Sequence, residues 1–275
     1  MTLLARWSFV AVLVLAGCRD EASVAAPTVA RGPQGLAPSS SAPRAAGSAS
    51  AAPPPPVPVD EGLVEFTTAG ADPAQPLPLV IALHGLGDRP ENFATWLREL
   101  PVPARVYALR APTPWGPGFT WFPVTSRPGG TVDPAKIGPG VDEARSRLLA
   151  DLDRLVARRP THGWPVLTGF SQGGMLSFAM AARSPERFAG VFPISGVLPE
   201  SIEPLAPPAG APRLVAFHGD DDPRVPVSLA RTSIERFTAH GWKASLRSYP
   251  GVSHAIGTDE RRALLEAIGG ALTGR

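Results

Sequence analysis

Ser171 is the residue of this sequence whose type and surroundings indicate chemistry most directly. It lies in Gly169-Phe170-Ser171-Gln172-Gly173-Gly174, which contains the G-x-S-x-G pattern of a nucleophilic serine on a strand-to-helix turn. A strand-like run over 164–169 leads into this segment, and a helix-like run over 175–182 follows it. Glycines suit such a turn, because the serine backbone is strained and a neighbouring Cβ would clash with the strand or helix. The pattern also arises by chance, so the chain must supply a base, an acid and donors for an oxyanion.

His254 is the candidate general base among five histidines. It lies in a loop after a strand-like run and before the last helix-like run, and it follows the serine in the chain order Ser, acid, His. The alternative for His254 is a solvated loop histidine. His84 and His218 each precede a glycine at a strand end and are predicted to shape turns, whereas His162 and His240 are predicted to lie at the surface.

Three consecutive carboxylates, Asp220, Asp221 and Asp222, follow another strand-like run and are the candidates for the acid. Only one of them can hold the tautomer of the imidazole and stabilise the imidazolium. We predict Asp222, because the proline after it and the Val-Pro pair at 225–226 fix the loop beneath it. The other two are predicted to be solvated or to cap backbone groups.

An oxyanion hole requires two backbone N–H donors. The first is predicted at Gln172, the residue after the nucleophile. The second should come from the loop after an early strand, and the glycine-rich segment 83–88 is that loop, with Leu86 as the predicted donor. The alternative is a plain glycine-rich turn. The order of loop, serine, acid and histidine along the chain favours the oxyanion hole over this alternative.

Strand-like and helix-like runs alternate along 61–275. The expected strands cover 63–67, 77–83, 105–109, 164–169, 190–194, 214–218 and 244–249. The expected helices cover 141–159, 175–182, 227–240 and 259–272. This alternation predicts an α/β fold, a mostly parallel central sheet with helices on both faces. Ligands of such sheets bind at the carboxyl ends of the strands, where the candidate residues fall.

Four segments together resemble the phospholipase/carboxylesterase family of α/β-hydrolases, which includes the acyl-protein thioesterases and small bacterial carboxylesterases. They are 83–88, 169–174, 218–223 and 250–254, and the resemblance extends over nearly all of 61–275. The resemblance implies an α/β-hydrolase fold without a large lid domain. It also implies that Ser171 is the nucleophile, Asp222 the acid and His254 the base. Leu86 and Gln172 would supply the oxyanion amides.

Trp121 and Phe122 are the candidate substrate-binding residues. They lie in 118–122, which resembles the aromatic segment beside the acyl pocket of this family. The alternative is that both side chains belong to the ordinary core. The surrounding stretch 111–140 is rich in Gly and Pro, and we expect it to be loop-rich and to form part of the rim of the site.

The first 18 residues are predicted to be a lipoprotein signal peptide. A weakly basic start precedes an apolar run over 7–15, which is too short to span a bilayer as a mature helix. Leu15-Ala16-Gly17-Cys18 resembles the bacterial lipobox, which implies cleavage before Cys18 and attachment of lipid to that thiol, the one cysteine of the chain. The alternative is an ordinary signal peptide with an isolated cysteine. An anchored protein would belong to the bacterial cell envelope, facing the periplasm or at the outer membrane.

Residues 19–60 are predicted to be a disordered tether that holds the catalytic domain, 61–275, off the membrane. Of these 42 residues, 11 are Ala, 9 are Pro and 6 are Ser, so the segment cannot bury enough apolar surface to offset its ordering entropy. The formal net charge of the whole chain is only +2, and it contains no basic run with interleaved aromatic residues. Nucleic-acid binding is therefore not expected.

The sequence predicts a serine carboxylesterase that acts on a small-molecule ester by two-step acyl transfer. The same residues would act on a thioester or a lysophospholipid. Neither a cofactor nor a metal ion is expected, because Ser, His and Asp with two amides complete this chemistry. The alternatives are a tethered serine peptidase or polyester depolymerase with the same triad, or a non-catalytic binding protein on a hydrolase scaffold.

Overall fold

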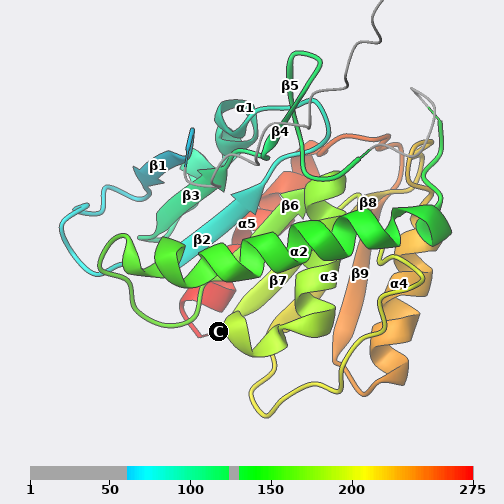
Figure 1. The fold of residues 1–275 in the computed structure, drawn as a ribbon. Helices are drawn as coiled ribbons and strands as arrows, with labels where there is room; N and C mark the ends of the chain where they lie inside the picture. The colour runs from blue at the N-terminus through cyan, green and yellow to red at the C-terminus, as the bar shows by residue number, and fades with distance from the viewer. Residues whose placement is uncertain (1–60, 124–129, 275) are drawn as a thin grey trace, which may run out of the picture. The chain divides into compact units, whose positions relative to one another are not determined.

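The computed structural model describes residues 61–123 and 130–274, in which a seven-stranded sheet has the order β1-β3-β2-β6-β7-β8-β9 (Figure 1). Its strands are β1 (Val64–Thr67), β2 (Leu79–Leu83), β3 (Arg105–Leu109), β6 (Val166–Phe170), β7 (Gly190–Ile194), β8 (Arg213–Gly219) and β9 (Ala244–Tyr249). β1 runs antiparallel to β3 at one edge, and all other neighbouring strands are parallel. The predicted α/β fold with a mostly parallel sheet is confirmed.

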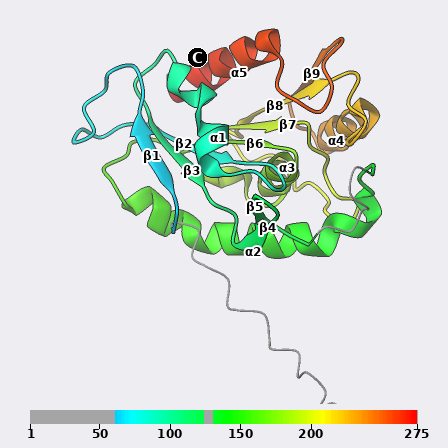
Figure 2. The same ribbon diagram turned by 90° about the horizontal axis from the view of Figure 1, so that it is seen from above.

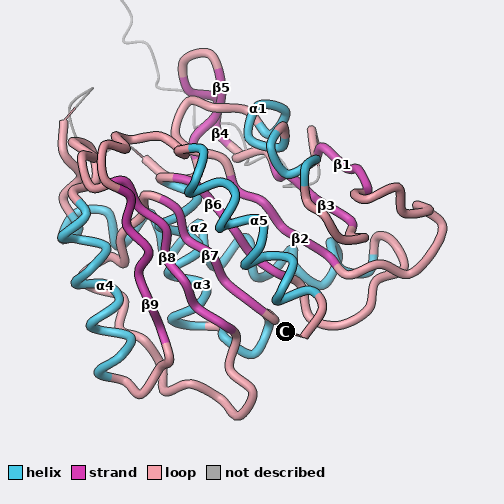
Figure 3. Tube along the Cα trace, turned by 180° about the vertical axis from the view of Figure 1, so that it is seen from behind, coloured by secondary structure: helices cyan, strands magenta, loops and turns pink. Residues whose placement is uncertain are grey.

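The helices cover both faces of this sheet (Figure 2 and Figure 3). They are α1 (Pro90–Ala94), α2 (Pro134–Ala157), α3 (Gln172–Arg183), α4 (Val227–Ala239) and α5 (Thr258–Leu272), with short 3-10 helices η1 (Trp96–Glu99) and η2 (Pro185–Arg187). One apolar cluster joins α2, α3 and α4 to the sheet, and a second joins α1, η1 and α5 to the opposite face. Ile81 belongs to the first cluster and Val80 to the second, as the alternation of side chains along a strand requires.

Helix α2 begins earlier than the sequence predicts. The regular spacing of apolar residues predicts a start at Val141, whereas the helix begins at Pro134. Asp133 caps it by accepting the N–H of Ala135 at 3.1 Å, and a proline in the first position needs no hydrogen-bond acceptor. Pro139 lies inside the helix, and its presence conceals the helical pattern from the sequence.

The stretch 111–140 contains regular structure where the sequence predicts loops. Besides the start of α2, it contains a hairpin of β4 (Thr113–Trp115) and β5 (Gly118–Thr120). The hairpin lies on the loop after β2, because Phe119 accepts the N–H of Gly87 at 2.8 Å and donates its own N–H to Asp88 O at 3.1 Å. The hairpin therefore braces the loop that is expected to contribute to the oxyanion hole.

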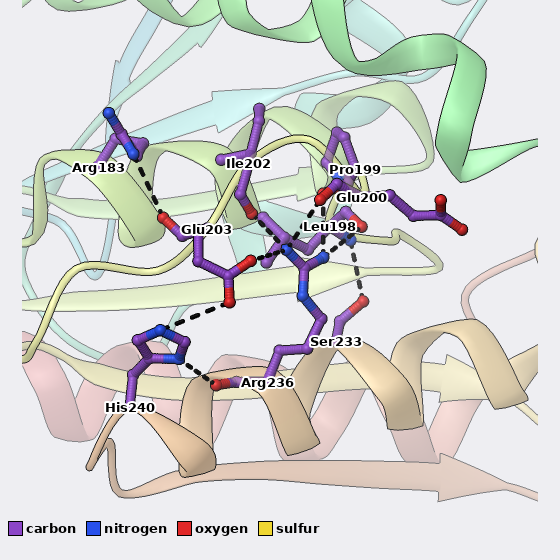
Figure 4. Close-up of polar contacts among 9 residues, drawn as sticks. All are labelled: Arg183, Leu198, Pro199, Glu200, Ile202, Glu203, Ser233, Arg236 and His240. Atoms are coloured by element: carbon purple, nitrogen blue, oxygen red, sulfur yellow. Dashed lines mark hydrogen bonds and ion pairs between the residues drawn. The ribbon is translucent and has the colours of Figure 1, made fainter.

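Arg236 of α4 holds the loop that follows β7 (Figure 4). Its guanidinium donates to the carbonyl of Ile202 at 2.7 Å and to the carboxylate of Glu203 at 2.8 Å. Ser233, one turn earlier on α4, accepts the N–H of Leu198 at 2.9 Å. These side chains satisfy the backbone of an irregular segment that packs against the apolar core.

The predicted signal peptide 1–18, with Cys18, and the tether 19–60 lie outside the described residues. Within 61–123 and 130–274, none of the helices combines the length and the apolar character that crossing a membrane requires.

Candidate active site

Ser171 occupies a sharp turn between β6 and α3. Its φ of 53° lies in the left-handed region, which a residue with a side chain enters at a cost of about 1–3 kcal/mol. The turn fits only with glycine neighbours. A Cβ on Gly169 would lie 2.4 Å from Gly173 O, and one on Gly173 would lie 2.1 Å from Leu83 O. The backbone N–H of the serine donates to Ile194 O at 2.9 Å, which ties the turn to β7.

The structure brings Ser171, His254 and Asp222 into one hydrogen-bonded series. The serine Oγ lies 3.0 Å from His254 Nε2, and His254 Nδ1 lies 2.7 Å from Asp222 Oδ2. With the proton on Nδ1, the imidazole donates to the carboxylate and accepts from the serine hydroxyl. The side chain of His254 is 13% exposed, and the ring of Phe170 lies 4.9 Å from it, centroid to centroid. The base is therefore held in place but open to a substrate.

Asp222 is buried and ionised. Burial by itself raises the pKa of its carboxyl, but hydrogen bonds from His218 and His254 and from the N–H of Val225 outweigh burial and hold the pKa well below its usual range. Oδ1 accepts the N–H groups of Arg224 and Val225, each at 2.9 Å. This carboxylate is therefore available as a fixed negative charge for the imidazolium.

The neighbouring carboxylates do not contact His254. Asp221 is exposed and Asp220 half-buried, and their backbone N–H groups donate to Val252 O and Tyr249 O. These two backbone hydrogen bonds join the loop that contains Asp222 to the segment that leads to His254, so the acid and the base are positioned together.

The other histidines lie outside the series. His84 is buried, with Nδ1 2.7 Å from Gly85 O and Nε2 accepting the N–H of Ala111, and burial lowers its pKa. His218 is also buried and supports Asp222, since its Nε2 lies 3.4 Å from Oδ2 and 2.7 Å from Val225 O. His162 is exposed as expected, whereas His240 is half-buried against α4.

The two predicted oxyanion donors lie on segments beside the serine. Gln172 is the first residue of α3, so its N–H has no acceptor within the helix. Leu86 follows Gly85, at which a Cβ would lie 3.5 Å from the Cβ of Ser171. The amide of Leu86 makes no hydrogen bond within the described part of the chain. The assignment of both amides to an oxyanion remains a prediction.

Trp121 and Phe122 are buried, with exposed fractions of 3% and 5%, and both belong to the core cluster beneath α2 and α3. Trp121 Nε1 donates to His84 O at 2.8 Å. These positions fit the alternative of ordinary core, and a direct contact with substrate remains a prediction.

The side chain of Gln172 has a role that the sequence analysis missed. It accepts the N–H of Trp121 at 3.1 Å and donates to Phe122 O at 3.1 Å, so it links the serine turn to the aromatic segment. Its oxygen also lies 3.0 Å from Thr120 Oγ1. The motif predicts a role only for the backbone N–H of Gln172. A long polar side chain in a glycine-rich turn is unusual, and this was the signal in the sequence for a role of the side chain.

Among the described residues, no three His, Cys, Asp or Glu side chains gather as metal ligands. Ser171, His254 and Asp222 are the side chains that the structure brings together for acyl transfer. The serine can attack an acyl carbon while the histidine takes its proton, and the carboxylate stabilises the cation that results.

Comparisons with known proteins identify a family and several relatives of this chain. A family described as Phospholipase/Carboxylesterase matches residues 64–269. The chain is 24% identical over 213 residues to acyl-protein thioesterase 1 of Gibberella zeae, which covers 66% of this chain and 85% of that protein. It is 28% identical over 198 residues to a probable carboxylesterase of Oryza sativa subsp. japonica, which covers 67% and 74%.

Solved structures share the fold. The crystal structure of esterase PE8 matches with a TM-score of 0.62 at 25% identity, covering 74% of this chain and 95% of that one. The Bacillus cereus carboxylesterase matches with a TM-score of 0.61 at 15% identity, covering 77% and 96%, and supports the fold alone.

Proposed function

We propose that this chain, which belongs to the phospholipase/carboxylesterase family and is a hydrolase of that family, cleaves small carboxylic esters through an acyl-enzyme on Ser171. The observation that carries this proposal is the hydrogen-bonded series from the serine Oγ through His254 to Asp222. Thioesters and lysophospholipids undergo the same attack and form part of the test.

The first step is acylation. His254 Nε2 takes the hydroxyl proton while Ser171 Oγ attacks the carbonyl carbon, and Asp222 stabilises the imidazolium. The tetrahedral intermediate then collapses, and the alcohol leaves with the proton from His254. In the second step a water molecule repeats the sequence on the acyl-enzyme and releases the acid.

The oxyanion is stabilised by the amides of Leu86 and Gln172. The position of Gln172 at the start of α3 supports its assignment, because a free N–H at a helix N-terminus favours negative charge. The loop with Leu86 is supported by its approach to the serine and by the hairpin that braces it. Each such donor contributes about 3 kcal/mol to lowering the barrier.

The test is turnover of p-nitrophenyl esters, from acetyl to palmitoyl, by the full chain in detergent. Ser171→Ala should lower kcat/KM by about 10⁴-fold or more with an unchanged melting temperature. Persistent activity in this variant would refute the assignment. Cleavage of peptides or polyesters without cleavage of the small esters would favour a peptidase or depolymerase, and binding without any turnover would favour a non-catalytic protein.

The cellular address is a separate part of the proposal. We propose three segments: a lipoprotein signal peptide at 1–18, a tether at 19–60 and the catalytic domain at 61–275. Lipid on Cys18 would anchor the enzyme to a membrane of the bacterial cell envelope. Cys18→Ser should move the protein from the membrane fraction to the soluble fraction, and unchanged partitioning would rule out a lipid anchor.

A further inference from the structure

Glu260 is a fully buried carboxyl that caps the N-terminus of α5. It lies in the first turn of α5 with an exposed fraction of 0%. Its Oε2 accepts the N–H of Gly257 at 3.0 Å, while its Oε1 is buried and has no hydrogen-bond partner among the described residues. A carboxyl group is among the groups least often fully buried, and an unpaired buried oxygen carries a desolvation cost. The helix cap accounts for Oε2 but not for the buried, unpaired Oε1, which suggests a role beyond capping.

The Glu260 carboxyl holds the loop that carries the catalytic histidine. Gly257 follows His254 by three residues, and its N–H is bound by the carboxyl. A Cβ on Gly257 would lie 2.8 Å from Val252 Cγ2, so this end of the loop packs closely against its beginning. A titratable group therefore fixes the end of the backbone segment that joins His254 to α5.

The same carboxyl is electrostatically coupled to the acid of the triad. Burial raises the pKa of Glu260 to about 7, the N–H of Gly257 and the His218 side chain oppose that rise, and Asp222 adds to it. The group therefore changes charge near neutral pH, where the enzyme is expected to act. Its ionisation would place a second negative charge near the Asp222–His254 pair.

The elements packed against α5 supply few other charges. β8 and the loop after it contribute His218 and Asp222, and β9 contributes Tyr249, whose phenol interacts with Glu260 and with Arg247. The segments of β6 and β7 contain no titratable side chain. On the outer side of α5, Arg261 pairs with Glu99 of η1 at 3.4 Å, and Asp259 with Arg262 at 2.9 Å.

His218 is a second buried side chain near α5 with an unpaired atom. Its Nε2 lies 2.7 Å from Val225 O and therefore carries a proton, whereas its Nδ1 is buried without a partner in the described chain. Glu260 therefore lacks the hydrogen bonds that compensate Asp222, although both carboxyls are buried.

We propose that Glu260 is a positioning residue of the catalytic site: it anchors the His254 loop through Gly257, and the loss of its proton stabilises the imidazolium formed on His254 during catalysis. This inference rests on the proposed function. The added negative charge acts through Asp222 and His254 and does not contact substrate. Ester turnover should therefore rise as Glu260 loses its proton.

Glu260→Gln separates the two roles, because the amide oxygen can still accept the N–H of Gly257 but can never become negative. The ratio of variant to wild-type kcat/KM should fall by about three-fold or more between about pH 5.5 and about pH 8.5. Glu266→Gln, an exposed change on the same helix, is the matched control, and its ratio should stay flat. A flat ratio for Glu260→Gln would overturn the proposal.

A second variant and a second readout make the result unambiguous. Glu260→Ala also removes the acceptor of Gly257, so it should lower the melting temperature and kcat/KM at every pH, and Gln should restore most of the loss. The rate at which a fluorophosphonate modifies Ser171 measures the same base without an ester. An unreactive wild-type serine would refute the proposed function, whereas a reactive serine with equal pH profiles in wild type and Glu260→Gln would refute only this inference.

If Glu260→Gln does not fold, the proposal can still be tested on the wild-type protein. Carbon-13 NMR of labelled glutamate carboxyls should show one group that titrates near neutral pH. Titration of every glutamate below about pH 5.5 would overturn the proposal.

Discussion

Asp222→Asn is the change whose effect the structure defines most closely. Asn can keep its Oδ1 in place to accept the N–H groups of Arg224 and Val225, each now 2.9 Å from the carboxylate. Its amide NH₂ then replaces Oδ2, which lies 2.7 Å from His254 Nδ1. Two donors cannot face each other, so His254 must place its proton on Nε2. In that tautomer it can no longer accept the proton of Ser171, 3.0 Å away.

We therefore expect the fold to survive and the chemistry to fail. The wrong tautomer and the loss of a buried negative charge together should lower kcat by about 10⁴-fold, or about 5 kcal/mol of barrier. The assay is p-nitrophenyl ester turnover at fixed pH, with circular dichroism and the melting temperature as checks of folding. Because the mechanism acts on kcat, KM should change far less than kcat.

Asp221→Asn is the matched control, since this carboxylate is exposed and only its backbone N–H is bonded. It should keep kcat within about two-fold, as surface changes commonly do. The reasoning fails if Asp222→Asn keeps more than about a tenth of the wild-type kcat in a folded protein. It also fails if Asp221→Asn is the variant that loses activity.

Three further changes test the scaffold around the site. Gly173→Ala places a Cβ 2.1 Å from Leu83 O and should lower the free energy of unfolding, measured in urea, by about 2–3 kcal/mol. Gly269→Ala is the control, because its Cβ would lie an ordinary 3.6 Å from Val102 and should not lower that free energy. Equal losses in the two variants would contradict the packing argument. Arg236→Met leaves the carbonyls of the β7 loop without their donor and should lower the unfolding free energy by about 2 kcal/mol. The pKa of Glu260 is about 7 in the folded protein and 4.5 ordinarily, so the free energy of unfolding of the wild type should fall by about 3 kcal/mol as the pH rises from 4.5 to about 7. Glu260→Gln should lack that fall. Parallel pH profiles of stability in the two proteins would refute the raised pKa of Glu260.

Much of the fold could be predicted from the sequence, because its signals are local. The runs 105–109 and 190–194 give the same strands in the structure, since a buried parallel strand is recorded in consecutive residues. The predicted start of α2 at 141 was wrong, because Pro134 and Pro139 interrupt the periodic apolar pattern from which a helix is predicted. The β4–β5 hairpin was missed because its three-residue strands are too short to show alternation.

Contacts between distant segments could be predicted only where a known chemical order guided the choice. The prolines after Asp222 favoured it over two adjacent carboxylates, and the structure shows it 2.7 Å from His254 Nδ1 with Asp221 exposed. Likewise, the sequence does not show that the indole N–H of Trp121 donates to His84 O or that its ring is buried. The direction of a side chain depends on packing that no local pattern contains.

The sequence by itself determined the class of chemistry: a serine on a strained turn, an acid and a histidine in the right order, and glycines that only such a turn requires. Those features are visible because steric limits act on neighbouring residues. Only the tertiary structure decided that Gln172 joins the turn to the aromatic segment and that Glu260 is buried beneath the histidine loop. Burial and charge coupling arise from residues far apart in the chain, so they appear only once the chain has folded.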